Sequence, residues 1–126
     1  MADVNGTWLG TYWQAGTPTR FEATFIQSGN SLSGRILDDN HLGEAQIDGE
    51  VVGRSIRFTK RYLTPSHHSV SYSGTLTEDA NSMQGNWTIG VLYSGSWEAH
   101  RNDENLMADL RNRLEQKVPV EALVGG

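Results

Sequence analysis

Apolar and polar residues alternate along most of the chain between residues 6 and 101. In the run 69–76, for example, Val70, Tyr72 and Leu76 fall on one face, and serine and threonine side chains fall on the other. A period of two is typical of antiparallel strands that bury one face and expose the other. About eight such runs are separated by turns rich in Gly, Ser, Asn and Asp, so one strand recurs about every 12 residues.

The spacing of these runs predicts a closed β-barrel. Short turns make sequential strands neighbours, and an eight-stranded antiparallel up-and-down sheet avoids unpaired edges by closing on itself. Glycine on the inward face agrees with closure, because it lets a strand bend or leaves room beside a large indole. A barrel of this size is either filled by side chains or holds one small ligand. The inward glycines are Gly10, Gly34, Gly49, Gly74, Gly85 and Gly95.

The pattern changes after Arg101. Apolar residues then recur at spacings of three and four up to Leu114, and Pro119 follows. This spacing predicts an α-helix over about 103–117 with one apolar stripe, followed by a flexible tail over 118–126. The helix packs on the barrel wall, covers one barrel end or forms a dimer contact. Residues 1–126 are thus expected to form a single domain with a barrel over about 6–101.

Composition narrows the functional classes. A net charge of −5 argues against binding to nucleic acid, and 37% apolar with 20% charged residues is typical of a soluble globular protein. Because there is no cysteine, disulfides and zinc–cysteine sites are excluded, and a cytoplasmic location is expected. No signal peptide and no apolar run of about 20 residues is visible, so no membrane span is expected. Homo-oligomer formation stays open.

Two short motifs carry a resemblance to a known superfamily. Gly6-Thr7-Trp8 opens the first strand, and Trp97-Glu98-Ala99-His100-Arg101 closes the last. A Gly-x-Trp start with an Arg-ended final strand resembles the calycin superfamily, and the short strand spacing is closer to avidins than to lipocalins. The resemblance implies that Trp8 plugs one barrel end with Arg101 stacked across it, and that the barrel holds a small apolar molecule.

The biotin-binding residues of avidins are not present at the matching positions. Where avidins carry an Asn and a Ser in and after the first strand, this chain has Gly10 and Gln14. The tyrosine and serine of the third avidin strand fall near Ile36 and Asp38. Each missing hydrogen bond to a buried ureido oxygen costs about 1–3 kcal/mol, so biotin is not the expected ligand.

The polar residues at one end of two neighbouring strands are the main candidates for chemistry. Lys60 and Tyr62 end the inward face of the fifth run, and Tyr72 faces inward on the sixth. They form a site for a carboxylate or enolate, or Lys60 has a lowered pKa and acts as a base or Schiff-base nucleophile. The favoured interpretation is simpler: the lysine extends to the rim to reach water, and the tyrosines are ordinary core residues.

The sequence gives little support for a metal site or a hydrolytic active site. His67 and His68 are adjacent, so they point to opposite faces and hold no metal together, although one of them can donate to a ligand at the pocket lip. Asp38-Asp39-Asn40 is predicted to be a hairpin turn, and no Asp or Glu is expected inside the barrel. Without paired inward carboxylates, a P-loop or a nucleophile elbow, a hydrolase is disfavoured, and no cofactor is expected.

The expected function is non-enzymatic binding of a small, mostly hydrophobic molecule inside the barrel. One alternative is a cofactor-free cyclase or isomerase, for which no catalytic residue is assigned. Another is a structural or interaction module with a filled barrel, whose Trp13 and helix surfaces bind protein. Leu92 and Tyr93, in the last hairpin, are expected either to fold over the mouth or to form an interface. The predicted ligand-binding residues are Tyr12, Phe21, Phe25, Phe58, Lys60, Tyr62, His68, Tyr72 and Trp87.

Overall fold

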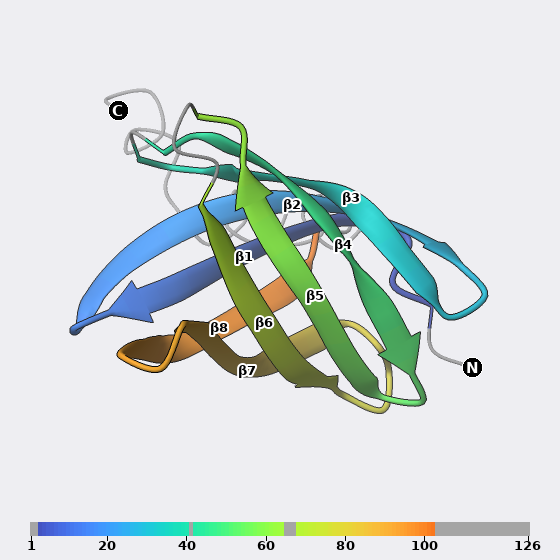
Figure 1. The fold of residues 1–126 in the computed structure, drawn as a ribbon. Helices are drawn as coiled ribbons and strands as arrows, with labels where there is room; N and C mark the ends of the chain where they lie inside the picture. Colours follow the sequence, from blue (N-terminus) through green and yellow to red (C-terminus); the bar gives the residue numbers. More distant parts are fainter. Residues whose placement is uncertain (1–2, 41, 65–67, 103–126) are drawn as a thin grey trace, which may run out of the picture.

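A computed structural model describes residues 3–40, 42–64 and 68–102 of the chain (Figure 1). Within these residues there is no helix of the length and apolar character that a membrane span needs. The helix expected over 103–117 and the tail over 118–126 lie outside the described residues. The elements are all strands: β1 (Gly6–Gln14), β2 (Thr17–Ser28), β3 (Ser31–Asp38), β4 (Glu44–Val52), β5 (Ser55–Tyr62), β6 (Ser69–Leu76), β7 (Ser82–Ile89) and β8 (Tyr93–Arg101).

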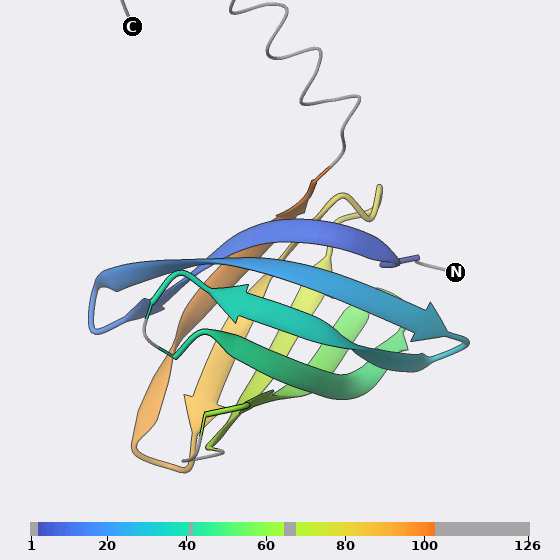
Figure 2. The same cartoon turned by 90° about the horizontal axis from the view of Figure 1, so that it is seen from above.

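The strands form a closed barrel in sequence order, as Figures 1 and 2 show from two directions. Each strand pairs antiparallel with the next, and β1 pairs with β8, where Trp8 lies opposite Arg101 and Tyr12 lies opposite Trp97. Closure leaves no strand edge unpaired. The prediction of an eight-stranded antiparallel up-and-down barrel is therefore confirmed.

Alternation along the strands puts the aromatic side chains inside. β5 alternates strictly between exposed and buried residues from Ser55 to Tyr62. The middle of the barrel is packed with rings: Phe58 stacks on Tyr72 at a centroid distance of 4.9 Å, and Trp97 meets Phe58 edge-on at 5.8 Å. This part of the barrel is a core filled by side chains, as expected for eight strands.

The barrel end where β1 begins is closed by an indole and a guanidinium. The Arg101 Cζ atom lies 4.6 Å from the centroid of the Trp8 ring, which is fully buried. The guanidinium donates hydrogen bonds to the carbonyl oxygens of Asp3 (2.6 Å) and Ala80 (2.9 Å). Trp8 Nε1 donates to the carbonyl of Val4 at 2.9 Å. The two residues expected to plug the barrel thus lie against each other, with their donors paired.

Glycine at position 85 is required by a close approach of β6 and β7. Gly85 lies opposite Gly74 inside the barrel, and a Cβ atom there would overlap the carbonyl oxygen of Ser73. We expect Gly85→Ala to lower the free energy of unfolding by about 1–3 kcal/mol, because the strands must separate. Urea denaturation measures this loss. The control is Asn86→Ala, on the exposed face of the same strand, for which we expect the free energy of unfolding to change by less than about 0.5 kcal/mol. Equal stability of both variants would contradict the close approach.

Candidate functional site

A cavity opens at the barrel end opposite the Trp8–Arg101 plug. The β1–β2, β3–β4, β5–β6 and β7–β8 connections lie at this end. The cavity has a volume of about 190 Å³, and we call it the mouth cavity. That is more space than a few waters take at about 30 Å³ each, and an engineered protein cavity of about 150 Å³ accepts benzene. Its lining residues are Tyr12, Gln14, Leu42, Tyr62, His68, Val70, Tyr72, Trp87 and Ile89.

A hydrogen-bonded cluster of buried polar side chains adjoins the mouth cavity. The Lys60 Nζ atom is 2.6 Å from Asp38 Oδ1, and both side chains are fully buried. Two tyrosine hydroxyls donate to Asp38 Oδ2, from Tyr62 at 2.5 Å and from Tyr12 at 3.0 Å. Asn40, in the β3–β4 connection, donates to the Tyr12 hydroxyl at 3.0 Å. We call Tyr12, Asp38, Lys60 and Tyr62 the buried polar cluster.

Two expectations from the sequence are wrong at this cluster. Asp38 is not in a turn: it is the last residue of β3, faces inward opposite Phe21 and is only 4% exposed. Lys60 does not extend to the rim but is completely buried. Both side chains are buried for the same physical reason: the ammonium of Lys60 and the carboxylate of Asp38 are paired with each other, so neither charge has to be neutralised by contact with water. The inward parity of Leu32 and Ile36 continues to Asp38, and that signal was available in the sequence.

The Lys60 amine is enclosed by aromatic rings as well as by Asp38. Its Nζ atom lies 4.8 Å from the ring centroids of Tyr12 and Tyr62, 5.6 Å from Tyr72 and 5.9 Å from Phe21. Ring faces attract a cation, so they complement the carboxylate. Burial lowers the pKa of Lys60, and the Asp38 carboxylate opposes that shift.

The tyrosines of this region remain protonated. Burial raises the pKa of Tyr12, Tyr62 and Tyr72, and the negative charge of Asp38 acts in the same direction. At neutral pH these hydroxyls are therefore neutral hydrogen-bond donors. This protonation state matches the two hydroxyls that donate to Asp38.

The structure brings only some of the predicted ligand-binding residues together. Tyr12, Tyr62, His68, Tyr72 and Trp87 line the mouth cavity. Lys60 is next to it but is not a lining residue, because the tyrosine rings lie around its amine. The remaining predicted residues, Phe21, Phe25 and Phe58, are buried in the packed core. The lining residues that sequence reasoning missed are Gln14, Leu42, Val70 and Ile89.

Trp13 lies on the outside of the barrel. β1 pairs in regular register with β2 as far as Gln14, so no bulge turns Trp13 inward. Its carbonyl oxygen accepts a hydrogen bond from Trp87 Nε1 at 3.1 Å, which ties β1 to a side chain of the mouth cavity. Leu92 and Tyr93, in and after the β7–β8 turn, are 83% and 59% exposed and so do not fold over the mouth.

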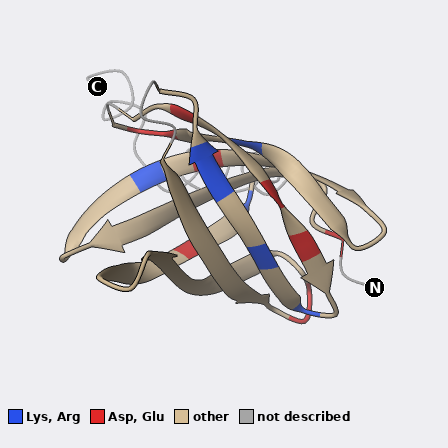
Figure 3. Cartoon of the chain, in the orientation of Figure 1, with Lys and Arg blue, Asp and Glu red and all other residues tan. Residues whose placement is uncertain are grey.

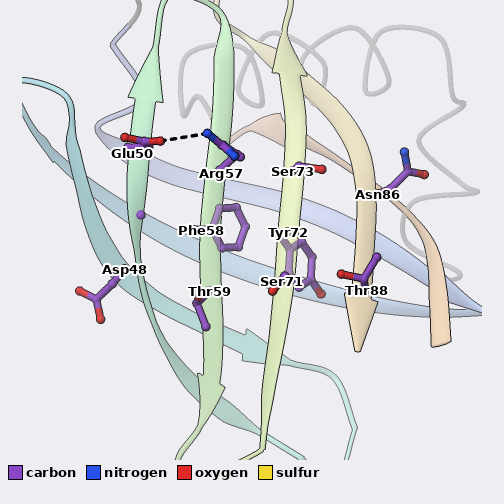
Figure 4. Close-up of a pocket in the computed structure, with 11 residues that line it drawn as sticks. Asp48, Glu50, Arg57, Phe58, Thr59, Ser71, Tyr72, Ser73, Asn86 and Thr88 are labelled. Atoms are coloured by element: carbon purple, nitrogen blue, oxygen red, sulfur yellow. Dashed lines mark hydrogen bonds and ion pairs between the residues drawn. The ribbon is translucent and has the colours of Figure 1, made fainter. Parts of the chain in front are cut away.

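A second hollow lies on the outer face of β4–β7 and has a different character (Figure 4). Its volume is about 530 Å³, and its outward side chains are small and polar or charged, such as Thr59 and Ser71. It contains an ion pair between Arg57 and Glu50 at 3.4 Å, with side chains 72% and 51% exposed. Enclosed apolar pockets with few polar groups are the usual small-molecule sites, so the mouth cavity is the stronger candidate.

Charges elsewhere point to no further site. Figure 3 shows acidic and basic residues interspersed over the strands in this view, with no face of one sign. Among the described residues, no group of three His, Cys, Asp or Glu side chains is arranged to hold a metal ion.

The chain matches no protein family model and no curated protein. Among solved structures it is similar to a redesigned β-barrel, mFAP1, determined bound to DFHBI. The TM-score is 0.64 at 13% sequence identity, and the alignment covers 78% of this chain and 94% of that chain. At this identity the likeness shows the fold, an antiparallel β-barrel, and nothing about the residues of the mouth cavity.

Proposed function

We propose that this protein binds a small, mostly apolar molecule in the mouth cavity without changing it chemically, as a calycin-like binder that does not recognise biotin. The observation that carries the proposal is the mouth cavity, whose lining is mainly aliphatic and aromatic. Its volume of about 190 Å³ also argues against the alternative of a filled barrel. The redesigned barrel bound to DFHBI supports the proposal at the level of the fold alone.

The physical basis of binding is burial of apolar surface on preformed walls. Removing apolar surface from water contributes about 25 cal/mol per Å². Tyr12 and Tyr62 are held in place because both hydroxyls are bonded to Asp38. Rings that are already ordered lose little conformational entropy when a ligand arrives. In this proposal the buried polar cluster supports the walls and does not itself react.

Filling the mouth cavity with protein tests the proposal. We expect Ile89→Trp, at the half-buried end of β7, to occupy the cavity and abolish ligand retention. The matched control is Val91→Trp, which adds the same side chain at a fully exposed position of the β7–β8 turn. The measurement is native mass spectrometry of each variant purified from its own host. A small molecule retained by the wild type and by Val91→Trp, but not by Ile89→Trp, is expected.

The opposite result is equally clear. If Ile89→Trp is folded by circular dichroism and retains the same added mass as the wild type, the mouth cavity is not the binding site. If the wild type retains no molecule and binds none of a set of one-ring aromatic compounds in titration, the proposed function is wrong.

A cofactor-free cyclase or isomerase is the second candidate. The observation that favours it is a fully buried lysine with a lowered pKa beside two tyrosine hydroxyls. Against it, Lys60 is bonded to Asp38 and does not line the mouth cavity. The double variant Lys60→Met with Asp38→Asn removes the amine without leaving a buried charge. A catalyst that uses the amine loses turnover of the retained molecule, whereas a binder keeps its affinity.

A further inference from the structure

The polar groups beside the mouth cavity differ in whether their hydrogen-bond donors are already committed within the protein. The Tyr12 hydroxyl donates to Asp38 and accepts from Asn40, so its one donor is already committed. The Tyr62 hydroxyl uses its one hydrogen-bond donor on Asp38, and the Lys60 charge is cancelled by the same carboxylate. The buried polar cluster is therefore neutral overall and keeps its donors for itself.

The Tyr72 hydroxyl differs from those of Tyr12 and Tyr62. The side chain is 4% exposed, and its hydroxyl forms no hydrogen bond with any described residue. No buried side-chain oxygen or nitrogen in the described part of the chain lacks a partner, so this oxygen is not fully enclosed, and Tyr72 is one of the residues that line the mouth cavity. Figure 4 shows the hydroxyl pointing along the strands toward the mouth end. The hydroxyl is therefore free to form a hydrogen bond with a ligand in the cavity.

The ring that carries this hydroxyl is rigidly held. It stacks on Phe58 with an interplanar angle of 12° and meets Trp97 edge-on at a centroid distance of 5.6 Å. On the neighbouring strand Trp87 lies directly opposite and also lines the mouth cavity. The hydroxyl is thus at a fixed point between ring walls, which is the arrangement that orients a flat ligand.

We propose that the ligand is an uncharged, flat molecule of one or two rings, with one hydrogen-bonding group held by the Tyr72 hydroxyl. This inference rests on the proposed function and specifies its ligand class. The size follows from the volume of about 190 Å³, slightly above that of a benzene-sized cavity. The hydroxyl is protonated and so can donate to a carbonyl or accept from an N–H or O–H.

The absence of charge follows from the lining. The described residues that line the mouth cavity include no Lys, Arg, Asp or Glu. An ionised ligand would lose its hydration and find Lys60 and Asp38 already paired with each other at 2.6 Å. Burying a charge without a counter-charge is strongly unfavourable. Carboxylates and enolates, which the sequence alone left as ligands of Lys60, are therefore excluded from the proposed class.

Four one-ring probes of similar size test the inference: toluene, benzamide, benzoate and benzylammonium. We expect wild-type protein to bind benzamide most tightly in calorimetric titrations, with benzoate and benzylammonium at least about tenfold weaker. Tyr72→Phe should weaken benzamide about three- to tenfold and leave toluene unchanged, because it deletes only the hydroxyl. Tyr93→Phe makes the same change at an exposed position outside the mouth cavity and should alter nothing.

Each outcome decides a different claim. Tightest binding of a charged probe, or equal benzamide affinity in Tyr72→Phe and the wild type, overturns the ligand class and leaves the proposed function standing. If no probe binds the wild type, toluene included, the proposed function fails together with the inference. Because Tyr72→Phe keeps the ring that packs on Phe58 and Trp97, the variant is expected to fold, and near-ultraviolet circular dichroism checks this.

Discussion

Replacing Lys60 by methionine is expected to lower the free energy of unfolding by about 3–5 kcal/mol. The substitution removes the amine 2.6 Å from Asp38 and leaves a fully buried carboxylate without a counter-charge. The hydroxyls of Tyr12 and Tyr62 still donate to that carboxylate, but hydrogen bonds from neutral groups do not replace a cation. Urea denaturation followed by tryptophan fluorescence measures the loss.

A double variant separates the pair from the individual residues. Lys60→Met combined with Asp38→Asn removes both charges, keeps a carbonyl oxygen for the tyrosine hydroxyls and is expected to be more stable than either single variant. Exposed pairs contribute about 0–1 kcal/mol, so Arg57→Met, which breaks the exposed Arg57–Glu50 pair, is the control. If the effects of the two single substitutions simply add, or if Lys60→Met costs no more than Arg57→Met, the buried ion pair is not what holds this region together.

Replacing Trp8 by alanine is expected to lower the free energy of unfolding by about 3–5 kcal/mol. The indole is fully buried at the closed barrel end, packs edge-on against Phe25 and lies beneath the Arg101 guanidinium. Its loss creates a cavity and removes the ring face that the cation contacts. Chemical denaturation of the variant and the wild type gives the difference.

Trp13 provides the control for this prediction. It is also a β1 tryptophan, but it is only partly buried and on the outer face. Trp13→Ala is expected to cost about 1 kcal/mol, since far less apolar surface returns to water. A similar cost for the two variants would mean that the barrel end is not closed by Trp8.

The sequence predicted the barrel because its signal is repeated in every strand. Runs such as that of Val70, Tyr72 and Leu76 each indicate a half-buried strand, and the short turns fix which strands are neighbours. Errors in single residues do not change a pattern repeated over eight strands. The resemblance carried by the Gly-x-Trp start and the Arg-ended last strand likewise indicated the Trp8–Arg101 contact, although the two residues are far apart in the sequence.

The candidate site was less predictable because it depends on where strands end and on pairs far apart in the chain. Reading Asp38 as part of a turn hid a carboxylate that is 22 residues from its partner Lys60. Without that carboxylate, the rim was the favoured place for Lys60. Phe58 and Tyr72 share the inward parity and lie directly opposite each other, yet only Tyr72 lines the mouth cavity, because the space left open depends on how side chains from several strands fit together.

By itself, then, the sequence determined the fold class, the strand order and most of the inward-facing residues, Asp38 excepted, since these follow from local periodicity and turn chemistry. The tertiary structure alone decided which inward residues pack solidly and which leave space, because cavities arise from the fit of side chains on several strands. It also decided the role of Lys60. A lysine on an apolar face is a rim residue, a nucleophile or half of an ion pair depending on what faces it across the barrel, and here Asp38 faces it.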